Sequence, residues 1–255
     1  IAIVAHVDHG KTTLVDTLLQ QSGTFAAHSQ TVERVMDSND LEKERGITIL
    51  SKNTGLKWKE YRINIVDTPG HADFGGEVER VLSMVDSVLL LVDAVDGPMP
   101  QTGFVTKKAL QAGLRPIVVI NKVDRDGARP DWVLNQTFDL FDRLGADENQ
   151  LDFPVVYASA IQGWATENLS NKTDNMDTIF ETIINNVAAP KVDPNGNLQI
   201  QVSALSYSSY VGLIGTGRIR RGQVKKGQTV SIGSVDGSVR QGKVLQIMNF
   251  HGLDK

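Results

Sequence analysis

Short apolar runs recur along the first two thirds of the chain and alternate with helix-like stretches. The runs comprise the opening "IAIVAHV" and residues 63–67, 88–94, 116–122 and 153–160. Uninterrupted apolar segments of this length are typical of strands buried on both faces of a sheet. The helix-like stretches lie between them, at 75–86, 101–113 and 130–144. This order predicts an α/β fold, with a mostly parallel sheet covered by helices on both sides.

The pattern changes after the helix-like stretch 177–187. "APKVDPNGN", which begins at Ala189, collects the residues of turns and linkers, and short Gly-rich strands typical of a small β-barrel follow it. Upstream, "GLKWKEYRINIVD" (55–67) predicts a hairpin that adds one antiparallel edge strand, and the polar stretch 162–176 predicts a surface loop. We therefore expect an α/β domain over 1–189, a linker over 190–196, and an incomplete barrel domain over 197–255.

Composition narrows the class of protein. A hydrophobic fraction of 40% with 22% charged residues is typical of a globular chain rather than a disordered one. The absence of cysteine excludes a disulfide framework and any thiolate metal site. No apolar run approaches the roughly 20 residues of a membrane helix, and no signal peptide is evident. We expect a cytoplasmic monomer without membrane contact and, since Ile1 lies within a strand-like run, a piece of a longer protein.

The charge is distributed unevenly. The chain carries a net charge of -4, but residues 197–255 hold eight Lys and Arg against two Asp, a balance of +6, which leaves -10 for the first 196 residues. The stretch "RIRRGQVKKG" (218–227) holds five of these basic residues and no acid. It is either the solvated rim of a hairpin or a surface that contacts phosphates.

"DHGKTT" (8–13) follows the first apolar run, at an expected strand-to-helix junction. Such junctions bind phosphate, because the N–H groups of the first helical turn lack partners and carry the positive end of the helix dipole. Gly10 lets the backbone approach, Lys11 supplies charge to the outer phosphates, and Thr12 offers a hydroxyl to Mg²⁺. Ala5 stands where the strict P-loop has its first Gly, so an ordinary strand-to-helix turn remains the alternative from this motif alone.

"DTPGH" (67–71) places Asp67 at the tip of a parallel strand, where open α/β sheets bind ligands. Its carboxylate could hold Mg²⁺, and Gly70 would let a backbone N–H approach the terminal phosphate. A turn built on Pro and Gly is the alternative. In "ERGITI" (44–49), the hydroxyl of Thr48 could bind Mg²⁺ when a third phosphate is present, although "ITIL" could simply begin the edge strand.

"NKVD" (121–124) also follows a strand. Asp124 can accept two hydrogen bonds from the N1 and amino donors of guanine, a pair that adenine lacks on that edge. Asn121 can bond the purine and brace the loop, while the stem of Lys122 can lie along the ring. At the end of the last strand, "ASA" could set a backbone N–H against the guanine oxygen, so Ser159 and Ala160 complete the predicted base site. Together these residues favour GTP and GDP over ATP.

"AHVDHGKTTL", "RGITI", "DTPGH" and "NKVD" together resemble the translational GTPases, the superfamily that contains elongation factors Tu and G. Longer stretches, such as "RVMDSNDLEKERGITI" and "NKVDRDGARPDWV", are most similar to the bacterial BipA/TypA family of ribosome-associated GTPases, which are linked to stress and ribosome assembly. The resemblance covers essentially the whole chain. It implies a P-loop GTPase domain followed by a barrel domain like that of elongation factor Tu, with further domains beyond residue 255.

The resemblance also implies roles for individual residues. Asp8, His9 and Thr13 join Lys11 and Thr12 in the phosphate and metal site, and Thr48 and Asp67 become switch residues. His71 falls where the family orients the attacking water, and Val7 and Ile47 match the apolar pair that flanks it. From its own residue type alone, His71 would be a solvent-facing turn residue. Ile161 departs from the commoner Lys or Leu, so its role is left open.

The predicted activity is hydrolysis of GTP to GDP and phosphate with Mg²⁺, as a conformational switch. No in-chain arginine finger is evident, so we expect slow intrinsic turnover that a partner accelerates. The partner implied is the ribosome, its rRNA and proteins, reached through the full-length protein. The alternatives are a translation-factor type of GTPase with another target, such as sulfate activation or tRNA delivery, and a module that binds guanine nucleotide without hydrolysing it.

Overall fold

The computed structural model describes residues 1–23, 52–68, 75–250 and 252, and it separates into two compact units. The first unit comprises Ile1–Ala189 with a short return of the chain from Phe250, and the second comprises Pro190–Asn249. No helix of the described residues is long and apolar enough to cross a membrane. Each unit is described separately.

The first unit is built on a seven-stranded sheet with the order β2-β3-β1-β4-β5-β6-β7. Five strands pair in parallel, and the two outermost strands are antiparallel to their neighbours. The strands are β1 (Ala2–Ala5), β2 (Lys52–Trp58), β3 (Tyr61–Asp67), β4 (Ser87–Asp93), β5 (Arg115–Asn121), β6 (Val155–Ser159) and β7 (Trp164–Thr166). The prediction of a mostly parallel sheet with a 55–67 edge hairpin is confirmed.

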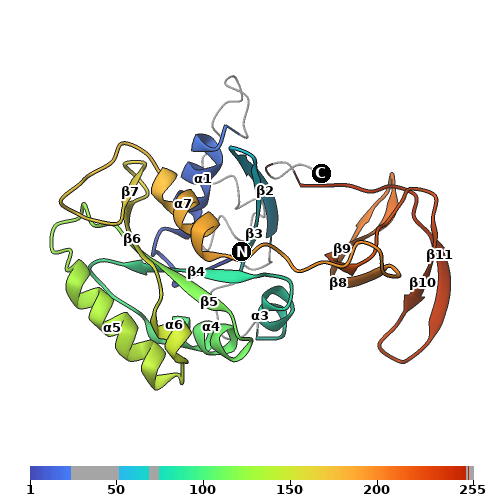
Figure 1. The fold of residues 1–255 in the computed structure, drawn as a ribbon, viewed down its shortest axis with the longest axis horizontal. Coiled ribbons are helices and arrows are strands. Elements are labelled where there is room, and N and C mark those ends of the chain that lie inside the picture. The colour runs from blue at the N-terminus through green and yellow to red at the C-terminus, as the bar shows by residue number, and fades with distance from the viewer. Residues whose placement is uncertain (24–51, 69–74, 251, 253–255) are drawn as a thin grey trace. The chain divides into compact units, whose positions relative to one another are not determined.

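Helices cover both faces of this sheet (Figure 1). The helices are α1 (Lys11–Gln21), α3 (Gly75–Leu82), α4 (Pro100–Gln111), α5 (Pro130–Arg143), α6 (Glu148–Leu151) and α7 (Asp177–Asn186). Leu89 and Leu91 of β4 belong to the core cluster formed with α1 and α7, whereas Leu90 belongs to the one formed with α3, α4 and α5. This alternation follows from the two-residue period of a strand, and it explains why the central strands are apolar throughout.

Local sequence sets the helix boundaries. Pro100 and Pro130 stand in the first turn of α4 and α5, where the missing N–H has no intrahelical acceptor to lose. After these helices, Gly113 and Gly145 adopt positive φ angles of 72° and 81°, a conformation that favours glycine. Asp147 caps the start of α6 through a reciprocal capping box with Gln150. The periodicity of the sequence does not reveal this short helix.

The stretch 162–176 differs from its prediction as a surface loop. Trp164, Ala165 and Thr166 are buried and form β7, which pairs with the outer side of β6. The hydroxyl of Thr173 donates to the carbonyl of Ala165 at 2.5 Å, and the N–H of Ala165 donates to the carbonyl of Asn175 at 2.9 Å. Three residues are too few for a strand period, so the sequence carries no signal for this edge.

The second unit consists of two antiparallel ribbons in the described residues. One pairs β8 (Gln199–Ser208) with β9 (Gly212–Arg221), and the other pairs β10 (Thr229–Gly233) with β11 (Val239–Lys243). Many of their apolar side chains are exposed, including Leu205, Leu213 and Val239. The predicted strand-rich second part is therefore present as two separate ribbons, and these four strands do not close into a barrel by themselves.

Candidate nucleotide-binding site

The motif residues gather at one edge of the first sheet because the parallel strands end there together. In the strand register, Ile3 lies opposite Asp67, Asp93 lies opposite Asn121, and Asn121 lies opposite Ala158. The carboxyl edge of an open parallel sheet is where ligands of such folds bind. The strand ends therefore bring the loops after β1, β3, β4, β5 and β6 into one cluster.

The loop between β1 and α1 has the backbone of an anion-binding turn. Asp8 and Gly10 adopt positive φ angles of 66° and 91°, and Gly10 is the residue before the first turn of α1. No side chain caps this helix start. A Cβ atom on Gly10 would lie 2.5 Å from Nδ2 of Asn121, so glycine is required both by the backbone and by the neighbouring loop.

Lys11 links this loop to the end of β3. Its Nζ lies 2.6 Å from Oδ1 of Asp67 and donates a hydrogen bond of 2.6 Å to the carbonyl of Thr68. The hydroxyl of Thr68 in turn donates to the carbonyl of Ile3 at 2.7 Å. The predicted phosphate lysine and the predicted metal carboxylate are thus in direct contact. Three other predicted residues, Thr48, Gly70 and His71, lie outside the described residues, as does Ile47.

Asn121 connects the loop after β1 with the loop after β6. Its Nδ2 donates to the carbonyl of His9 at 2.9 Å, and its Oδ1 accepts from the N–H of Ala160 at 3.0 Å. The hydroxyl of Thr17 in α1 donates to the carbonyl of Ala160 at 3.0 Å. A single buried amide therefore fixes the first and last motifs against each other.

The "ASA" motif lies at the end of β6, beside Asn121. The N–H of Ala160 donates to Oδ1 of Asn121, and a backbone contact of this motif with guanine stays a prediction. Ser159 is buried, and its hydroxyl accepts from the N–H of Gln162 at 3.3 Å. Both residues shape the loop in this structure. Ser159 and Ala160 are buried at the end of β6, where buried polar groups must find hydrogen-bond partners nearby.

Lys122 and Asp124 follow Asn121. Lys122 has a positive φ of 63°, and its Nζ donates to the carbonyl of Asp8 in the phosphate loop. Asp124 is exposed beyond the tip of β5. Thr12 and Thr13 lie in the first turn of α1, with Thr13 exposed. These positions place a base-type motif and a phosphate-type motif side by side, joined by side-chain bonds.

His9 occupies an unexpected position. Its side chain is buried behind the phosphate loop, with Nδ1 3.3 Å from the carbonyl of Leu91 and 5.1 Å between its ring centre and that of His6. Burial is the main reason that its pKa lies below the ordinary 6.5 of histidine; the neighbouring His6 and Lys122 lower it further. The imidazole is therefore neutral at neutral pH, and its buried ring packs behind the phosphate loop and supports it.

Asp93 is a buried acid that lies outside the motifs recognised in the sequence. It ends β4 with no exposed surface, and its carboxylate contacts Lys122 at 2.7 Å and Arg125 at 3.4 Å. Burial opposes its ionisation, but the hydrogen bond from Lys122 and the N–H groups of Val95 and Asp96 together hold its pKa below the ordinary value. The only signal in the sequence was an acidic residue within the apolar run 88–94.

The oxygen donors at the site suit Mg²⁺. Among the residues that the structure describes, no three His, Cys, Asp or Glu gather into a metal cluster. Mg²⁺ is commonly held by one or two carboxylates together with nucleotide phosphates, so a larger cluster is not needed. Asp67 supplies a buried carboxylate beside Lys11, and Thr12 stands next to Lys11 at the start of α1. This donor set fits a Mg²⁺ ion that arrives with a nucleotide.

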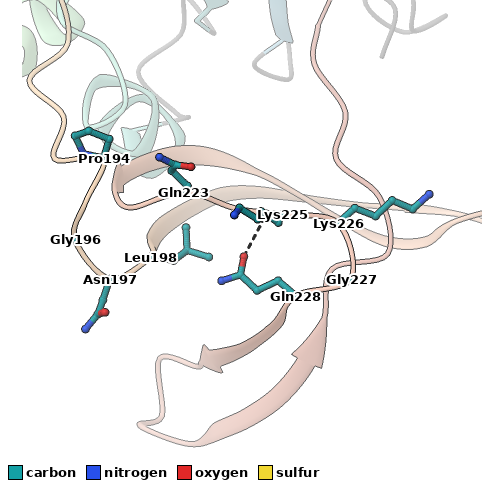
Figure 2. Close-up of a pocket in the computed structure, with 9 residues that line it drawn as sticks. All are labelled: Pro194, Gly196, Asn197, Leu198, Gln223, Lys225, Lys226, Gly227 and Gln228. Atoms are coloured by element: carbon teal, nitrogen blue, oxygen red, sulfur yellow. Dashed lines mark hydrogen bonds between the residues drawn. The ribbon is translucent and has the colours of Figure 1, made fainter.

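A hollow of about 610 Å³ lies elsewhere, within the second unit (Figure 2). Its lining comprises Pro194, Gly196, Asn197, Leu198, Gln223, Lys225, Lys226, Gly227 and Gln228. The side chain of Gln228 accepts a hydrogen bond of 2.9 Å from the N–H of Lys225, which closes the loop locally. None of the motif residues lines this hollow, and it lacks a buried charged side chain. The strand-edge cluster is the better candidate site.

Comparison with known proteins gives the family. Residues 1–189 match the elongation factor Tu GTP binding domain. Three relatives named large ribosomal subunit assembly factor BipA are 65% identical (Salmonella typhimurium strain LT2), 63% identical (Buchnera aphidicola subsp. Schizaphis graminum) and 64% identical (Haemophilus influenzae) to this chain. Each match covers 100% of this chain and 42% of the relative, so the chain spans less than half their length.

The fold is similar to that of a solved protein as well. The crystal structure of a bacterial selenocysteine-specific elongation factor, EF-Sec, matches with a TM-score of 0.68 over 94% of this chain and 37% of that chain. At 24% sequence identity this likeness concerns the fold alone. With the family matched over residues 1–189 and the phosphate and base motifs joined at one sheet edge, the chain belongs to the elongation factor Tu GTP-binding family of the translational GTPases.

Proposed function

We propose that this chain binds GTP and GDP with Mg²⁺ and hydrolyses GTP, as the nucleotide-binding part of a ribosome-associated assembly factor of the BipA type. The observation that carries the proposal is the double link between the two motifs: Asn121 bonds the carbonyl of His9, and Lys122 bonds that of Asp8. These bonds set the base motif at a fixed distance from the phosphate loop. Only a ligand with a base and phosphates uses both motifs at once.

In the proposed complex, each motif residue has one task. The first-turn N–H groups of α1 and Lys11 hold the phosphates, Asp124 selects the guanine edge, and the stem of Lys122 lies along the ring. Thr12, Thr48 and Asp67 would hold Mg²⁺, directly or through water, and the ion would neutralise charge that develops on the transferred phosphoryl group. Gly70 would donate its N–H to the terminal phosphate.

Hydrolysis needs an oriented water, and His71 is the residue that we propose for this role. An imidazole that accepts or directs a proton at the attacking water contributes about 10²- to 10⁴-fold in rate. Lys11 acts in the ground state too, because its charge meets the phosphates before and during the reaction. The two residues should therefore fail in different ways when replaced.

The domain assignment is part of the proposal. Residues 1–189 form the nucleotide domain, 190–196 the linker, and 197–255 part of a second, barrel-type domain. The basic stretch 218–227 lies on β9 and the loop after it, with Arg220 and Arg221 exposed. We propose that it adds an electrostatic share to ribosome contact, that the full-length protein acts as a monomer, and that it works in the cytoplasm.

The deciding experiment compares two variants in the full-length protein with purified ribosomes. His71→Ala should keep GTP and GDP affinities within a few-fold, while ribosome-stimulated hydrolysis falls by roughly 100-fold or more. Lys11→Ala should weaken nucleotide binding itself. Stimulated turnover near wild type in His71→Ala would remove that residue from the mechanism. Wild-type binding of GTP without any hydrolysis, with or without ribosomes, would favour the alternative of a guanine-nucleotide module without catalysis.

A second experiment tests the ribosome partnership. Residues 1–255 should bind ribosomes weakly and the complete protein strongly, because the missing domains supply most of the contact. The share contributed by 218–227 should fall as salt rises, since phosphate contacts release counterions. Equal and salt-independent binding by both proteins would contradict the proposed division. Failure of the complete protein to bind ribosomes would favour a GTPase with another target.

A further inference from the structure

We propose that Asp93 is a positioning residue for the base site: its buried carboxylate holds Lys122 where the stem of that lysine can lie along a guanine ring. The inference rests on the proposed function and goes beyond it, because Asp93 belongs to none of the nucleotide motifs. It acts through Lys122 and not by touching the nucleotide.

The carboxylate of Asp93 divides its two oxygens between two tasks. Oδ1 accepts hydrogen bonds from the N–H groups of Val95 at 2.7 Å and Asp96 at 3.3 Å, which folds the turn after β4. Oδ2 faces two cations, Nζ of Lys122 at 2.7 Å and Nη1 of Arg125 at 3.4 Å. One oxygen therefore shapes the local turn, and the other reaches the loop after β5.

Lys122 is held at two points. Besides the ion pair with Asp93, its Nζ donates to the carbonyl of Asp8 in the phosphate loop. Its backbone is in the left-handed region, with φ 63°, which a lysine adopts only when its surroundings compensate for the strain. The ammonium is thus fixed between the ends of β1 and β4. The hydrocarbon stem of Lys122 must therefore run from the loop after β5 toward the phosphate loop.

The pair matters because lysine is a flexible side chain. Fixing a lysine costs side-chain entropy, and a site that fixes it before the ligand arrives removes that cost from binding. Asp93 is fully buried, whereas Arg125 is half exposed, so the shorter contact with Lys122 is also the less solvated one. Without the carboxylate charge, Lys122 would keep the carbonyl of Asp8 as its partner among the described residues and would sample other rotamers.

The competing interpretation is that Asp93 merely stabilises its own turn. The substitution Asp93→Asn separates the two possibilities, because the amide oxygen can still accept from Val95 and Asp96 while the charge opposite Lys122 is lost. A matched control is Asp96→Asn, which removes an equal charge three residues away. The side chain of Asp96 is exposed, and the residue contributes only its backbone N–H to the carboxylate of Asp93 among the described contacts. The control variant retains this N–H.

The experiment measures GDP and GTP affinity of residues 1–255 by calorimetry, in the wild type and four variants. Asp93→Asn should bind both nucleotides about 10-fold more weakly, by an equal factor, because the contact concerns the base and not the third phosphate. Asp96→Asn should bind like the wild type. In a Lys122→Met background, adding Asp93→Asn should change affinity by less than about 2-fold, since the residue through which Asp93 acts is gone.

Wild-type affinity in Asp93→Asn would overturn the inference, and so would an undiminished effect in the Lys122→Met background, which would assign Asp93 to the turn alone. If Asp93→Asn does not fold, Asp93→Glu takes its place in the same cycle, since it keeps the charge but displaces it from Lys122; the same outcomes then decide. A wild-type chain that does not bind GDP would overturn the proposed function and this inference together, whereas binding by the wild type with an unaffected variant overturns the inference only.

Discussion

Replacing Gly10 by alanine tests whether the phosphate loop and the base motif are packed as one unit. Gly10 has a φ of 91°, and a Cβ atom there would lie 2.5 Å from Nδ2 of Asn121. The nearest atom of Lys122 would be its Cε, at 3.7 Å. The first distance is too short for any real contact, so the new methyl group must displace the amide of Asn121.

The expected cost has two parts. A left-handed backbone costs an alanine roughly 1–2 kcal/mol relative to glycine. Displacing Asn121 weakens its bonds to His9 and Ala160, each worth about 1 kcal/mol. The free energy of unfolding of the first unit should therefore fall by about 3–4 kcal/mol, a large share of the 5–15 kcal/mol typical of a domain.

The matched control is Gly113→Ala. Gly113 also has a positive φ, 72°, but a Cβ atom there would meet nothing within 4 Å. It carries the backbone strain without the collision, so its cost should be about 1–2 kcal/mol. The difference between the two variants, about 2 kcal/mol, measures the packing of the phosphate loop on Asn121.

Urea unfolding followed by tryptophan fluorescence is the appropriate assay, because Trp58, Trp132 and Trp164 are the chain's three tryptophans and all lie in the first unit. The measurement is made without nucleotide, so that binding does not add to stability. GDP affinity should also fall in Gly10→Ala and stay unchanged in Gly113→Ala. Equal losses of stability in the two variants would refute the packing of Gly10 against Asn121.

Two further predictions concern the base site and its support. Asp124→Asn should move nucleotide preference from guanine toward xanthine, because the extra carbonyl of xanthine can accept a hydrogen bond from the amide. Competition between GDP and XDP measures this preference. An unchanged preference, or equal competition by ATP in the wild type, would contradict the guanine assignment. The pKa of His9 in the folded chain lies below the ordinary 6.5, so the unfolded chain binds more protons at pH values between these two pKa values. The stability that neutral His9 contributes is therefore complete above about pH 6.5 and is lost as the pH falls toward its folded pKa. Urea midpoints between about pH 7.5 and 5.5 should decline more steeply in the wild type than in His9→Gln, and equal slopes would assign the dependence to another group.

The sequence by itself determined the order and type of the main elements. Apolar runs without alternation predicted the buried central strands, and the motifs "DHGKTT" and "NKVD" were placed correctly at strand ends. These features depend on residues close together in the chain. Backbone preference and a strand's two-sided burial act locally, so they leave a pattern that can be recognised without a structure.

Tertiary structure alone decided which residues meet. The strand order β1-β4-β5 brings Asp93 at the end of β4 to Lys122 after β5, and it brings Asn121 of β5 near His9 after β1. It also turned the N–H of Ala160 toward Asn121 and made a buried edge strand of Trp164–Thr166. Apart from the pairing of β7 with the nearby β6, these contacts join residues far apart in the chain. Their partners are set by the register of strands and the need to satisfy buried polar groups, and neither leaves a period or a motif in the sequence.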